Sequence, residues 1–547
     1  MRRILAPALD SNQPPPLVGY NLFEADLPLR ESLEREGASW AQDMVHELGA
    51  LAGTEQAIEW GFQANANPPQ LRTHDRFGNR IDEVDFHPAW HELMKVAIGH
   101  GLHALPWREP RPGAHAARAA GFYLWSQVEG GHGCPVSMTY AVIPALRKEP
   151  TVAEAWEPLV TTLDYDFGLR PAATKRGVLF GMAMTERQGG SDVRSNTMRA
   201  VPAGADGVHH LTGQKWFCSA PMCDAFLVLA QAPAGLSCFL LPRVLPDGTR
   251  NAFHIDRLKD KLGNRSNASA EITLDNAWAV MVGEEGRGVR TIIDMVNHTR
   301  LDCVIGSASL IRQAVAQATH HTAHRTAFGS RLSEQPLMMN VLADLAVESE
   351  ATTLLMMRLA GAFDRSGDPV EAHFRRIAVA VAKFWTCKRA IAVAAEALEC
   401  HGGNGYVEES ILPRLYREAP VNAIWEGSGN VNALDVLRAM RKEPESVAAF
   451  FVEVDTAAGA DRRLDSAVAN LKQDLGNAQQ IEARARHLVE RMAVVLQASL
   501  LVRHGDPDVA ELFCASRLGG DGGRSFGTLR PSSTFKSVIE RHRPRSS

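Results

Sequence analysis

One carboxylate lies in a stretch whose neighbours suit ligand binding. Residues 421–430 read VNAIWEGSGN, which places Glu426 between Trp425 and a Gly-Ser-Gly run. A carboxylate partly desolvated beside an indole suits a general base, and glycines let the backbone approach a ligand closely. The amides that open the following helix suit an anionic or polar cofactor edge. A helix-capping loop with a surface glutamate is the competing interpretation, and these ten residues alone do not separate the two.

A second stretch concentrates hydroxyl groups and bare backbone amides. Residues 182–193 read MAMTERQGGSDV, and such a loop could bind ring heteroatoms or phosphate oxygens. Residues 215–219, KWFCS, add aromatic surface beside a hydroxyl, which could cover one face of a flat ring. A turn-rich loop exposed to solvent is the alternative.

Four segments must position these stretches. Residues 1–180 are mostly helical in pattern with a loose N-terminal arm, and residues 181–285 carry short apolar runs separated by turns, typical of a small sheet or barrel. Helical spacing over 301–325, 337–363 and 374–400 predicts a bundle within 286–440. An extra helical segment fills 441–547. The predicted fold class is therefore α+β, mostly α: an N-terminal helical domain, a central β domain, a C-terminal four-helix bundle and an extra helical C-terminal domain.

Composition excludes several classes of protein. The chain has 547 residues, 45% apolar and 22% charged, with a formal net charge of −5, as in globular proteins. No apolar run approaches the ~18 residues of a membrane span. Eight cysteines without a Cys-x-x-Cys pair argue against zinc ribbons and disulfide frameworks, so we expect a reducing, cytoplasmic setting. His87 and His91 lie four residues apart without a third ligand nearby, and we predict no metal site.

The order of segments and the two loop sequences resemble the acyl-CoA dehydrogenase flavoprotein family over about residues 90–440. MTE at 184–186 with GGSD at 189–192 is similar to the family's first flavin-contacting signature, and GGNGY at 402–406 with WEGS at 425–428 is similar to its second. The resemblance implies FAD as cofactor. It also implies a homotetramer, because the family's Arg-x-x-Phe-Gly, at 325–329 here, reaches the FAD of a neighbouring subunit. The implied cofactor-binding residues are Met182, Met184, Thr185, Gly190, Ser191, Phe217, Ser219, Arg325, Phe328, Gln335, Ile424, Trp425, Gly427, Ser428 and Asn430.

The same resemblance gives Glu426 a catalytic role. It matches the base that, in many relatives, removes the α-proton of an acyl-CoA while the flavin accepts hydride from the β-carbon. Other relatives carry the base on the first helix of the bundle, where this chain has Thr299, which cannot serve. Trp425 replaces the usual tyrosine and would narrow the substrate channel. We therefore expect at most weak dehydrogenation of an isovaleryl-CoA-like substrate.

Four further features are similar to a DNA-associated branch of this family, linked to the adaptive response to DNA alkylation. They are NPP at 67–69, FHPAW at 86–90, the run RLKDKLGNRSNAS at 257–269, and the roughly 100 residues after the bundle. The likeness implies double-stranded DNA as a partner and an alkylating agent as a target.

The C-terminal segment could supply phosphate contacts. From residue 515 onward it carries seven Arg or Lys against two acids, and with a net charge of −5 any DNA-binding patch must be local. An ordinary basic tail, on an acyl-CoA dehydrogenase without a DNA role, is the alternative. The candidate nucleic-acid contacts are Arg438, Arg517, Arg524 and Arg530.

Overall fold

The computed structural model describes residues 12–204 and 207–544, so the predicted N-terminal arm at residues 1–7 lies outside the described residues. The chain forms two compact units. Unit 1 comprises the described parts of Met1–Ile58, Pro112–Val128 and Cys303–Ser547, and unit 2 those of Glu59–Arg111 and Glu129–Asp302. These units group residues by contact and not by sequence order, so the four-segment division stays a prediction.

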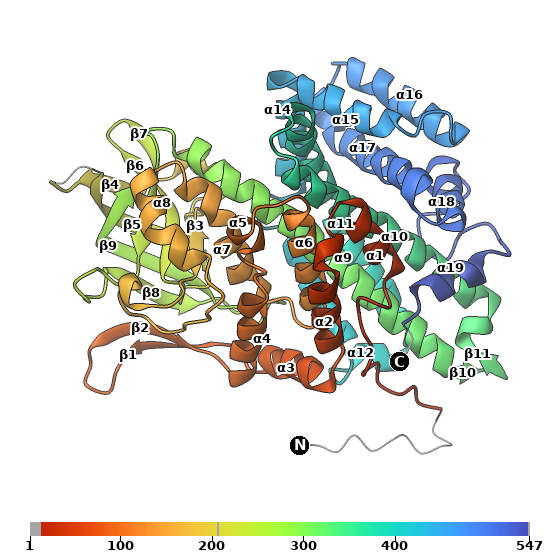
Figure 1. Cartoon of the computed structure of the whole chain (residues 1–547), viewed down its shortest axis with the longest axis horizontal. Coiled ribbons are helices and arrows are strands. Elements are labelled where there is room, and N and C mark those ends of the chain that lie inside the picture. Colours follow the sequence, from red (N-terminus) through yellow and green to blue (C-terminus); the bar gives the residue numbers. More distant parts are fainter. Residues whose placement is uncertain (1–11, 205–206, 545–547) are drawn as a thin grey trace. The chain divides into compact units, whose positions relative to one another are not determined.

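Unit 2 contains a seven-stranded sheet in the order β3-β6-β4-β5-β9-β7, with β8 paired to β9 (Figure 1). An additional pairing between β6 and β7 closes the sheet on itself. The predicted small β domain is therefore confirmed as a barrel-like sheet. Strand β6 pairs in parallel with β3 and β4, and the other pairings are antiparallel. The strands are β3 (Phe180–Ala183), β4 (Arg199–Pro202), β5 (Val208–Ser219), β6 (Ala225–Ala232), β7 (Gly235–Pro242), β8 (Phe253–Leu258) and β9 (Ser269–Met281).

The remaining elements of unit 2 are helical apart from one hairpin. Strands β1 (Gln70–His74) and β2 (Arg80–Asp85) pair antiparallel, and neither strand was predicted from the sequence. The helix that begins at Pro88 is capped by the His87 ring, which accepts from the Ala89 N–H at 3.2 Å. The helices are α4 (Pro88–Gly99), α5 (Leu105–Arg108), α7 (Gly133–Leu146) and α8 (Pro150–Val160), with α3 (Glu55–Ala66) and α9 (Gly288–His324) spanning the boundary between units.

Unit 1 is built around two long helices, α10 (Pro336–Asp364) and α11 (Pro369–Cys400), which pack against each other. Every side chain of α10 from Leu342 to Phe363 is buried, because helices cover it on several sides. The three long helices predicted from periodicity are confirmed, although α9 begins earlier than expected. The other helices of this part are α1 (Leu27–Arg35), α2 (Gln42–Ala52), α6 (Ala114–Ser126), α12 (Gly403–Tyr406), α13 (Leu412–Asn422) and α14 (Gly429–Lys442).

The predicted extra C-terminal segment is helical and packs within unit 1. Helix α17 contacts α10, α11, α14, α15, α16 and α18 (Figure 1). The segment consists of α15 (Glu445–Asp455), α16 (Arg462–Gly476), α17 (Ile481–His504), α18 (Pro507–Phe513), a π-helical turn at Cys514–Leu518, and α19 (Phe535–His542).

Helix α19 is fixed to the bundle by a buried carboxylate. Glu350 of α10 accepts hydrogen bonds from Arg541 Nε at 2.9 Å and from the His542 ring at 3.0 Å. Arg541 also pairs with Glu31 of unit 1. Burial alone would raise the pKa of Glu350, but His542 and Arg541 hold that pKa at about 2. The ionised carboxylate therefore joins segments far apart in the sequence.

Within the described parts of the chain, every helix is too short or too polar to cross a lipid bilayer. The eight cysteines form no disulfides, and seven of them are buried. The expected cytoplasmic setting stays a prediction.

Candidate functional site

The first predicted flavin loop leaves β3 in unit 2 and is anchored to β5. Met182 is buried in β3, where it pairs with Leu227 of β6. The Trp216 N–H donates to the Thr185 carbonyl at 2.8 Å, and Asn196 Nδ2 donates to the Met184 carbonyl at 2.9 Å. The loop thereby keeps a fixed path beside the aromatic end of β5.

Glycine at position 190 is required by a close approach within this loop. A Cβ there would lie 2.4 Å from Thr185 Oγ1, closer than real side chains pack. Ser191 follows it, exposed to solvent. The Gly-Gly-Ser sequence therefore folds tightly against Thr185 while its serine points away from the core of unit 2.

A buried ion pair holds the base of the loop. The Lys215 ammonium lies 2.8 Å from the Glu186 carboxylate, and both side chains are almost completely buried. Lys215 also donates to the Leu229 carbonyl at 2.7 Å, and Glu186 accepts from the Thr197 N–H at 2.6 Å. Burial would raise the pKa of Glu186, but the Lys215 charge and these hydrogen bonds lower it to about 2. This pair was not predicted from the sequence.

The end of β5 presents an aromatic ring beside free hydroxyl groups. Phe217 is 50% exposed, and Ser219 pairs with Ser269 of β9. The hydroxyls of Thr185, Ser191 and Ser219 make no hydrogen bond to any described residue. A half-exposed ring and three unused hydroxyls fit the stacking and polar contacts that a flavin ring requires.

Glu426 lies in unit 1, in the turn between α13 and α14. Its φ of 57° places this non-glycine residue in the left-handed region, which costs about 1–2 kcal/mol and is common at functional sites. Trp425 precedes it and donates from Nε1 to Asn422 Oδ1 at 3.1 Å, while Ile424 is exposed. The backbone therefore turns sharply at the predicted base, and neighbouring contacts fix the indole.

A buried lysine of α11 holds this turn. Lys383 donates to the Asn422 carbonyl at 3.1 Å and to the Gly427 carbonyl at 2.8 Å. Asn432, in the first turn of α14, donates to the Gly427 and Ser428 carbonyls at 2.6 and 3.0 Å. Sequence reasoning missed Lys383, although a single lysine within the apolar run IAVAVAKF could have indicated it.

The start of α14 also carries the last two predicted flavin contacts. The Ser428 hydroxyl makes no hydrogen bond to a described residue, so it is another unused polar group at a predicted contact. Asn430 Oδ1 accepts from Arg486 Nη1 of α17 at 3.2 Å. The C-terminal segment therefore touches the predicted flavin loop directly.

Three further predicted contacts gather at a small hairpin after α9. Strands β10 (Thr326–Ala327) and β11 (Ser330–Arg331) flank Phe328, which is 100% exposed with a φ of 53°. Gln335 Nε2 donates to the Ala327 carbonyl at 2.8 Å, and Arg325 Nη1 donates to the Asn12 carbonyl at 2.6 Å. The hairpin thus projects an apolar ring into solvent.

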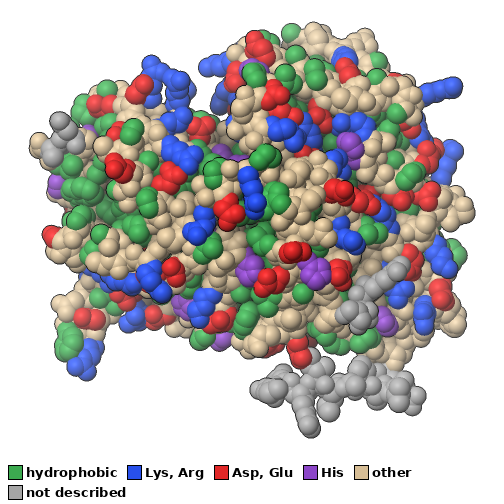
Figure 2. Space-filling model, viewed as in Figure 1, with side chains coloured by type: hydrophobic (Ala, Val, Ile, Leu, Met, Phe, Trp, Pro, Cys, Tyr) green, Lys and Arg blue, Asp and Glu red, His purple; other side chains and the backbone are tan. Residues whose placement is uncertain are grey.

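The predicted nucleic-acid residues occupy two kinds of place. Arg517 lies 2.5 Å from Asp344 and 3.5 Å from Glu348, both buried in α10, so its charge is used inside the bundle. Arg438, Arg524 and Arg530 are exposed. Figure 2 shows basic and acidic side chains interspersed over the face in view, in keeping with the low net charge.

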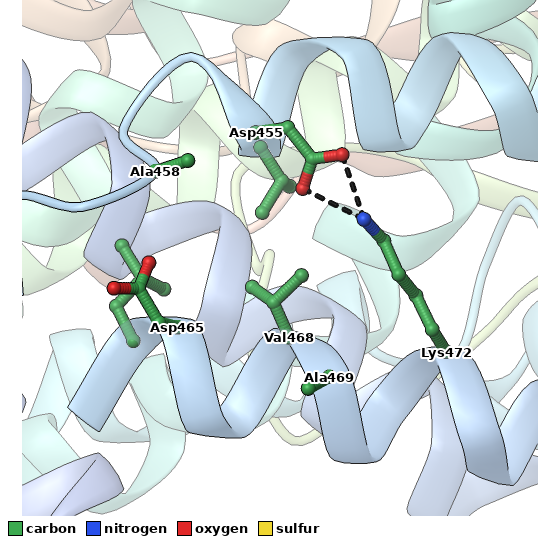
Figure 3. Close-up of a pocket in the computed structure, with 8 residues that line it drawn as sticks. Asp455, Ala458, Asp465, Val468, Ala469 and Lys472 are labelled. Atoms are coloured by element: carbon green, nitrogen blue, oxygen red, sulfur yellow. Dashed lines mark hydrogen bonds and ion pairs between the residues drawn. The ribbon is translucent and has the colours of Figure 1, made fainter. Parts of the chain in front are cut away.

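A cavity of about 210 Å³ lies between α15 and α16 in the C-terminal segment. Figure 3 shows that Lys472 donates to both carboxylate oxygens of Asp455, at 3.0 and 2.7 Å. The other residues that line the cavity are mainly alanine, valine and leucine, and none of them is a predicted site residue.

Comparison with known families defines the class of this protein. The N-terminal domain of the adaptive response protein AidB matches residues 12–167, the acyl-CoA dehydrogenase middle domain matches 181–277, and the acyl-CoA dehydrogenase C-terminal domain matches 286–441. The chain belongs to the acyl-CoA dehydrogenase family, whose members are FAD-dependent flavoproteins. The resemblance found in the sequence is confirmed.

Individual relatives are similar over nearly the whole chain. The putative acyl-CoA dehydrogenase AidB of Escherichia coli (strain K12) is 46% identical over 517 residues, which cover 94% of each chain. Acyl-CoA dehydrogenase family member 11 of Caenorhabditis elegans is 30% identical over 516 residues, 85% of this chain and 82% of that one. The structure of Caenorhabditis elegans ACDH-11 in complex with C11-CoA has a TM-score of 0.84 and 27% identity, covering 98% and 93% of the two chains.

Proposed function

We propose that this protein is an FAD-containing, AidB-like flavoprotein that binds double-stranded DNA and deflects or destroys alkylating agents. The observation that carries the proposal is the 46% identity to AidB along 94% of both chains, a coverage that must include most of the segment after the bundle. We further propose that any acyl-CoA dehydrogenase activity, on an isovaleryl-CoA-like substrate, is weak and depends on Glu426.

The unused hydroxyls support FAD as the cofactor. Thr185, Ser191, Ser219 and Ser428 stand at predicted flavin contacts, and none of their hydroxyl groups has a hydrogen-bond partner among the described residues. Polar groups without partners favour a ligand that offers both donors and acceptors. When bound, FAD would supply a hydride acceptor.

Glu426 would act as the base that removes the α-proton of a substrate. Its strained backbone is held by the contacts of Lys383 and Asn432 to the neighbouring carbonyls, so the carboxylate is positioned before a substrate arrives. The fixed indole of Trp425 beside it would limit the room for a bulky acyl chain.

Anaerobic flavin bleaching by isovaleryl-CoA tests this role. We expect slow, incomplete reduction of the FAD-loaded protein, and none in Glu426→Gln. Lys388→Met, a change five residues along α11 from Lys383, serves as a control and should bleach like the wild type. Fast, complete bleaching would refute the weak-activity proposal, and unchanged bleaching in Glu426→Gln would remove its role as base.

DNA binding is proposed through Arg438, Arg524 and Arg530, which are exposed, and not through Arg517, which pairs within the bundle. Phosphate contacts are salt-dependent and largely independent of sequence. A gel-shift salt series with duplex DNA should show binding at low salt and a weaker complex for the Arg524→Ala/Arg530→Ala double variant.

The intact chain is needed for this experiment, because α15, α17 and α19 pack on α10 and α11, so deletion after residue 440 would expose the bundle. Arg462→Ala removes an exposed arginine of α16 and is the matched control. Absence of any complex at low salt, or an equal loss in Arg462→Ala, would refute the proposed DNA contacts.

A homotetramer is also proposed. The fully exposed Phe328 and the adjacent Arg325 match family positions that reach a neighbouring subunit's FAD, and burial of the ring would favour association. Light scattering should give the mass of four chains, and Phe328→Ser should lower it. A wild-type monomer would contradict this assembly.

The alternative function is an ordinary acyl-CoA dehydrogenase, acting on a short or branched acyl-CoA without a DNA role. A specific observation favours it: the ACDH-11 structure in complex with C11-CoA matches 98% of this chain, including the C-terminal segment. That segment is therefore not by itself a sign of DNA binding. Efficient acyl-CoA turnover together with no DNA complex would select this alternative.

A further inference from the structure

A second cavity, of about 230 Å³, lies wholly within unit 2. It is lined by the two prolines that precede β1 and by the segment joining β8 to β9. This segment is the run at 257–269 that the sequence singled out and that the proposed flavin contacts do not use.

The cavity has a local excess of positive charge. Lys259, Lys261 and Arg265 line it, together with one carboxylate, Asp260. Lys259 lies 2.6 Å from the Glu271 carboxylate, which it shares with Arg257. Lys261 is also engaged within the protein, and its contacts include the Asn267 carbonyl at 2.6 Å and Ser269 Oγ at 3.0 Å.

Arg265 differs from these lysines. Its side chain is exposed, and it makes no ion pair or hydrogen bond within the described residues. A guanidinium group that lines a cavity without a protein partner is available to bind an oxyanion through two parallel hydrogen bonds.

Asn267 provides an independent indication of a ligand. The residue is 1% exposed, it lines the cavity, and neither its side-chain nitrogen nor its side-chain oxygen has a hydrogen-bond partner in the described structure. Leaving a buried amide unsatisfied costs about 1–3 kcal/mol, and buried polar groups are nearly always paired. The missing partner must offer both an acceptor and a donor.

We propose that this cavity binds a phosphate group in its singly protonated form. The Arg265 guanidinium would pair with the phosphate, Asn267 Nδ2 would donate to a phosphate oxygen, and the phosphate hydroxyl would donate to Asn267 Oδ1 or to Asp260. The volume exceeds the ~30 Å³ share of one water several-fold, so it admits a tetrahedral oxyanion with some solvent.

Two hydrogen-bond acceptors in the lining, Asn267 Oδ1 and Asp260, should make the site prefer phosphate to sulfate. Sulfate has the same shape as phosphate but no proton to donate, so Asn267 Oδ1 and Asp260 would face it unpaired. The proposal does not depend on FAD or on DNA binding.

Isothermal titration of the intact protein with inorganic phosphate tests the site. We expect saturable binding, at least tenfold weaker binding of sulfate, and at least a tenfold loss in Arg265→Ala and in Asn267→Leu. Arg257→Ala is the matched control, because Arg257 pairs with Glu271 and does not line the cavity. It should bind phosphate within twofold of the wild type.

A parallel titration with adenosine monophosphate tests whether the phosphate group belongs to a free anion or to a phosphorylated small molecule. Binding of inorganic phosphate alone indicates a free-anion site, whereas tighter binding of the ester indicates a phosphorylated small molecule, and either supports the proposal. Asn267→Leu removes an unsatisfied amide, so its melting temperature should not fall, and Arg265→Ala changes an exposed side chain. No saturable binding of either compound, equal affinity for sulfate, or an equal loss in Arg257→Ala would overturn the proposal.

Discussion

The two loops that carry the predicted flavin contacts are both anchored by a buried lysine, but the lysines are satisfied differently. In unit 2, Lys215 is paired with the carboxylate of Glu186. In unit 1, Lys383 donates to the carbonyls of Asn422 and Gly427 and has no carboxylate partner among the described residues. Loss of the first lysine leaves a buried charge behind, whereas loss of the second leaves only neutral acceptors. Replacement of the two lysines should therefore lower the unfolding free energy by different amounts, and the two losses should depend differently on pH.

The largest effect is expected for Lys215→Met. This change leaves the Glu186 carboxylate buried without its cation, which should cost about 3–5 kcal/mol of unfolding free energy. Urea denaturation followed by far-ultraviolet circular dichroism measures the loss. The Lys215→Met/Glu186→Gln double variant should recover part of it, and a double variant as unstable as the single one would contradict the proposed charge imbalance.

Acid should weaken the ion pair between Glu186 and Lys215 but not the contacts of Lys383. The pKa of this carboxyl is about 2 in the folded chain against an ordinary 4.5. A lowered pKa stabilises the fold fully above about pH 4.5, and this contribution of about 3 kcal/mol is lost as the pH falls towards 2. The difference in unfolding free energy between wild type and Glu186→Gln, measured from pH 6 to pH 3, should shrink with acidity. A difference that does not change with pH would contradict the assignment.

Lys383→Met should lower the unfolding free energy by less, and by the same amount from pH 6 to pH 3. It removes two charge-assisted hydrogen bonds without leaving an opposite charge buried, so we expect a loss of about 1–3 kcal/mol. If the proposed FAD is bound, the variant should also lose it more readily on dialysis, because Asn432 is then the one remaining side chain among the described residues that donates to the Gly427 carbonyl. Lys388→Met should retain both stability and FAD, and equal losses in the two variants would show that position 383 has no special role.

The smallest effect concerns the backbone at Glu426. With a φ of 57°, glycine is favoured there over any other residue, so Glu426→Gly should be more stable than Glu426→Ala by about 1 kcal/mol. Thermal unfolding of the two variants gives the comparison, which is independent of catalysis because both lack the carboxylate. Equal melting temperatures would mean that the strain is relieved by local adjustment.

Sequence patterns predicted the parts of the fold that depend on local periodicity. The long helices α9, α10 and α11 and strands β6 and β7 followed from apolar spacing, because one or both faces of each element are buried. The polar hairpin β1–β2 did not, since its strands alternate too weakly to be distinguished from a loop. The two loop motifs could be recognised because each is a short contiguous run of residues, which is visible in the sequence without knowledge of what surrounds it in the fold.

What supports those loops could not be predicted, because the contacts join residues distant in the sequence. Glu186 and Lys215 lie 29 positions apart, and Lys383 lies 44 positions from Gly427. Counting arginines in the C-terminal segment likewise could not show that Arg517 is paired with Asp344 of α10 while Arg524 is exposed. Composition counts charges, whereas the fold decides which of them remain available to a partner.

The contact of α19 with Glu350 bears on how the chain matures during synthesis. Glu350 leaves the ribosome 192 residues before His542, the residue that helps to neutralise it in the finished bundle. Until then α10 must keep that carboxylate hydrated, so its final packing is postponed until Arg541 and His542 have been synthesised. A chain that stops before Arg541 would retain a hydrated carboxylate at a position that α19 buries in the folded chain.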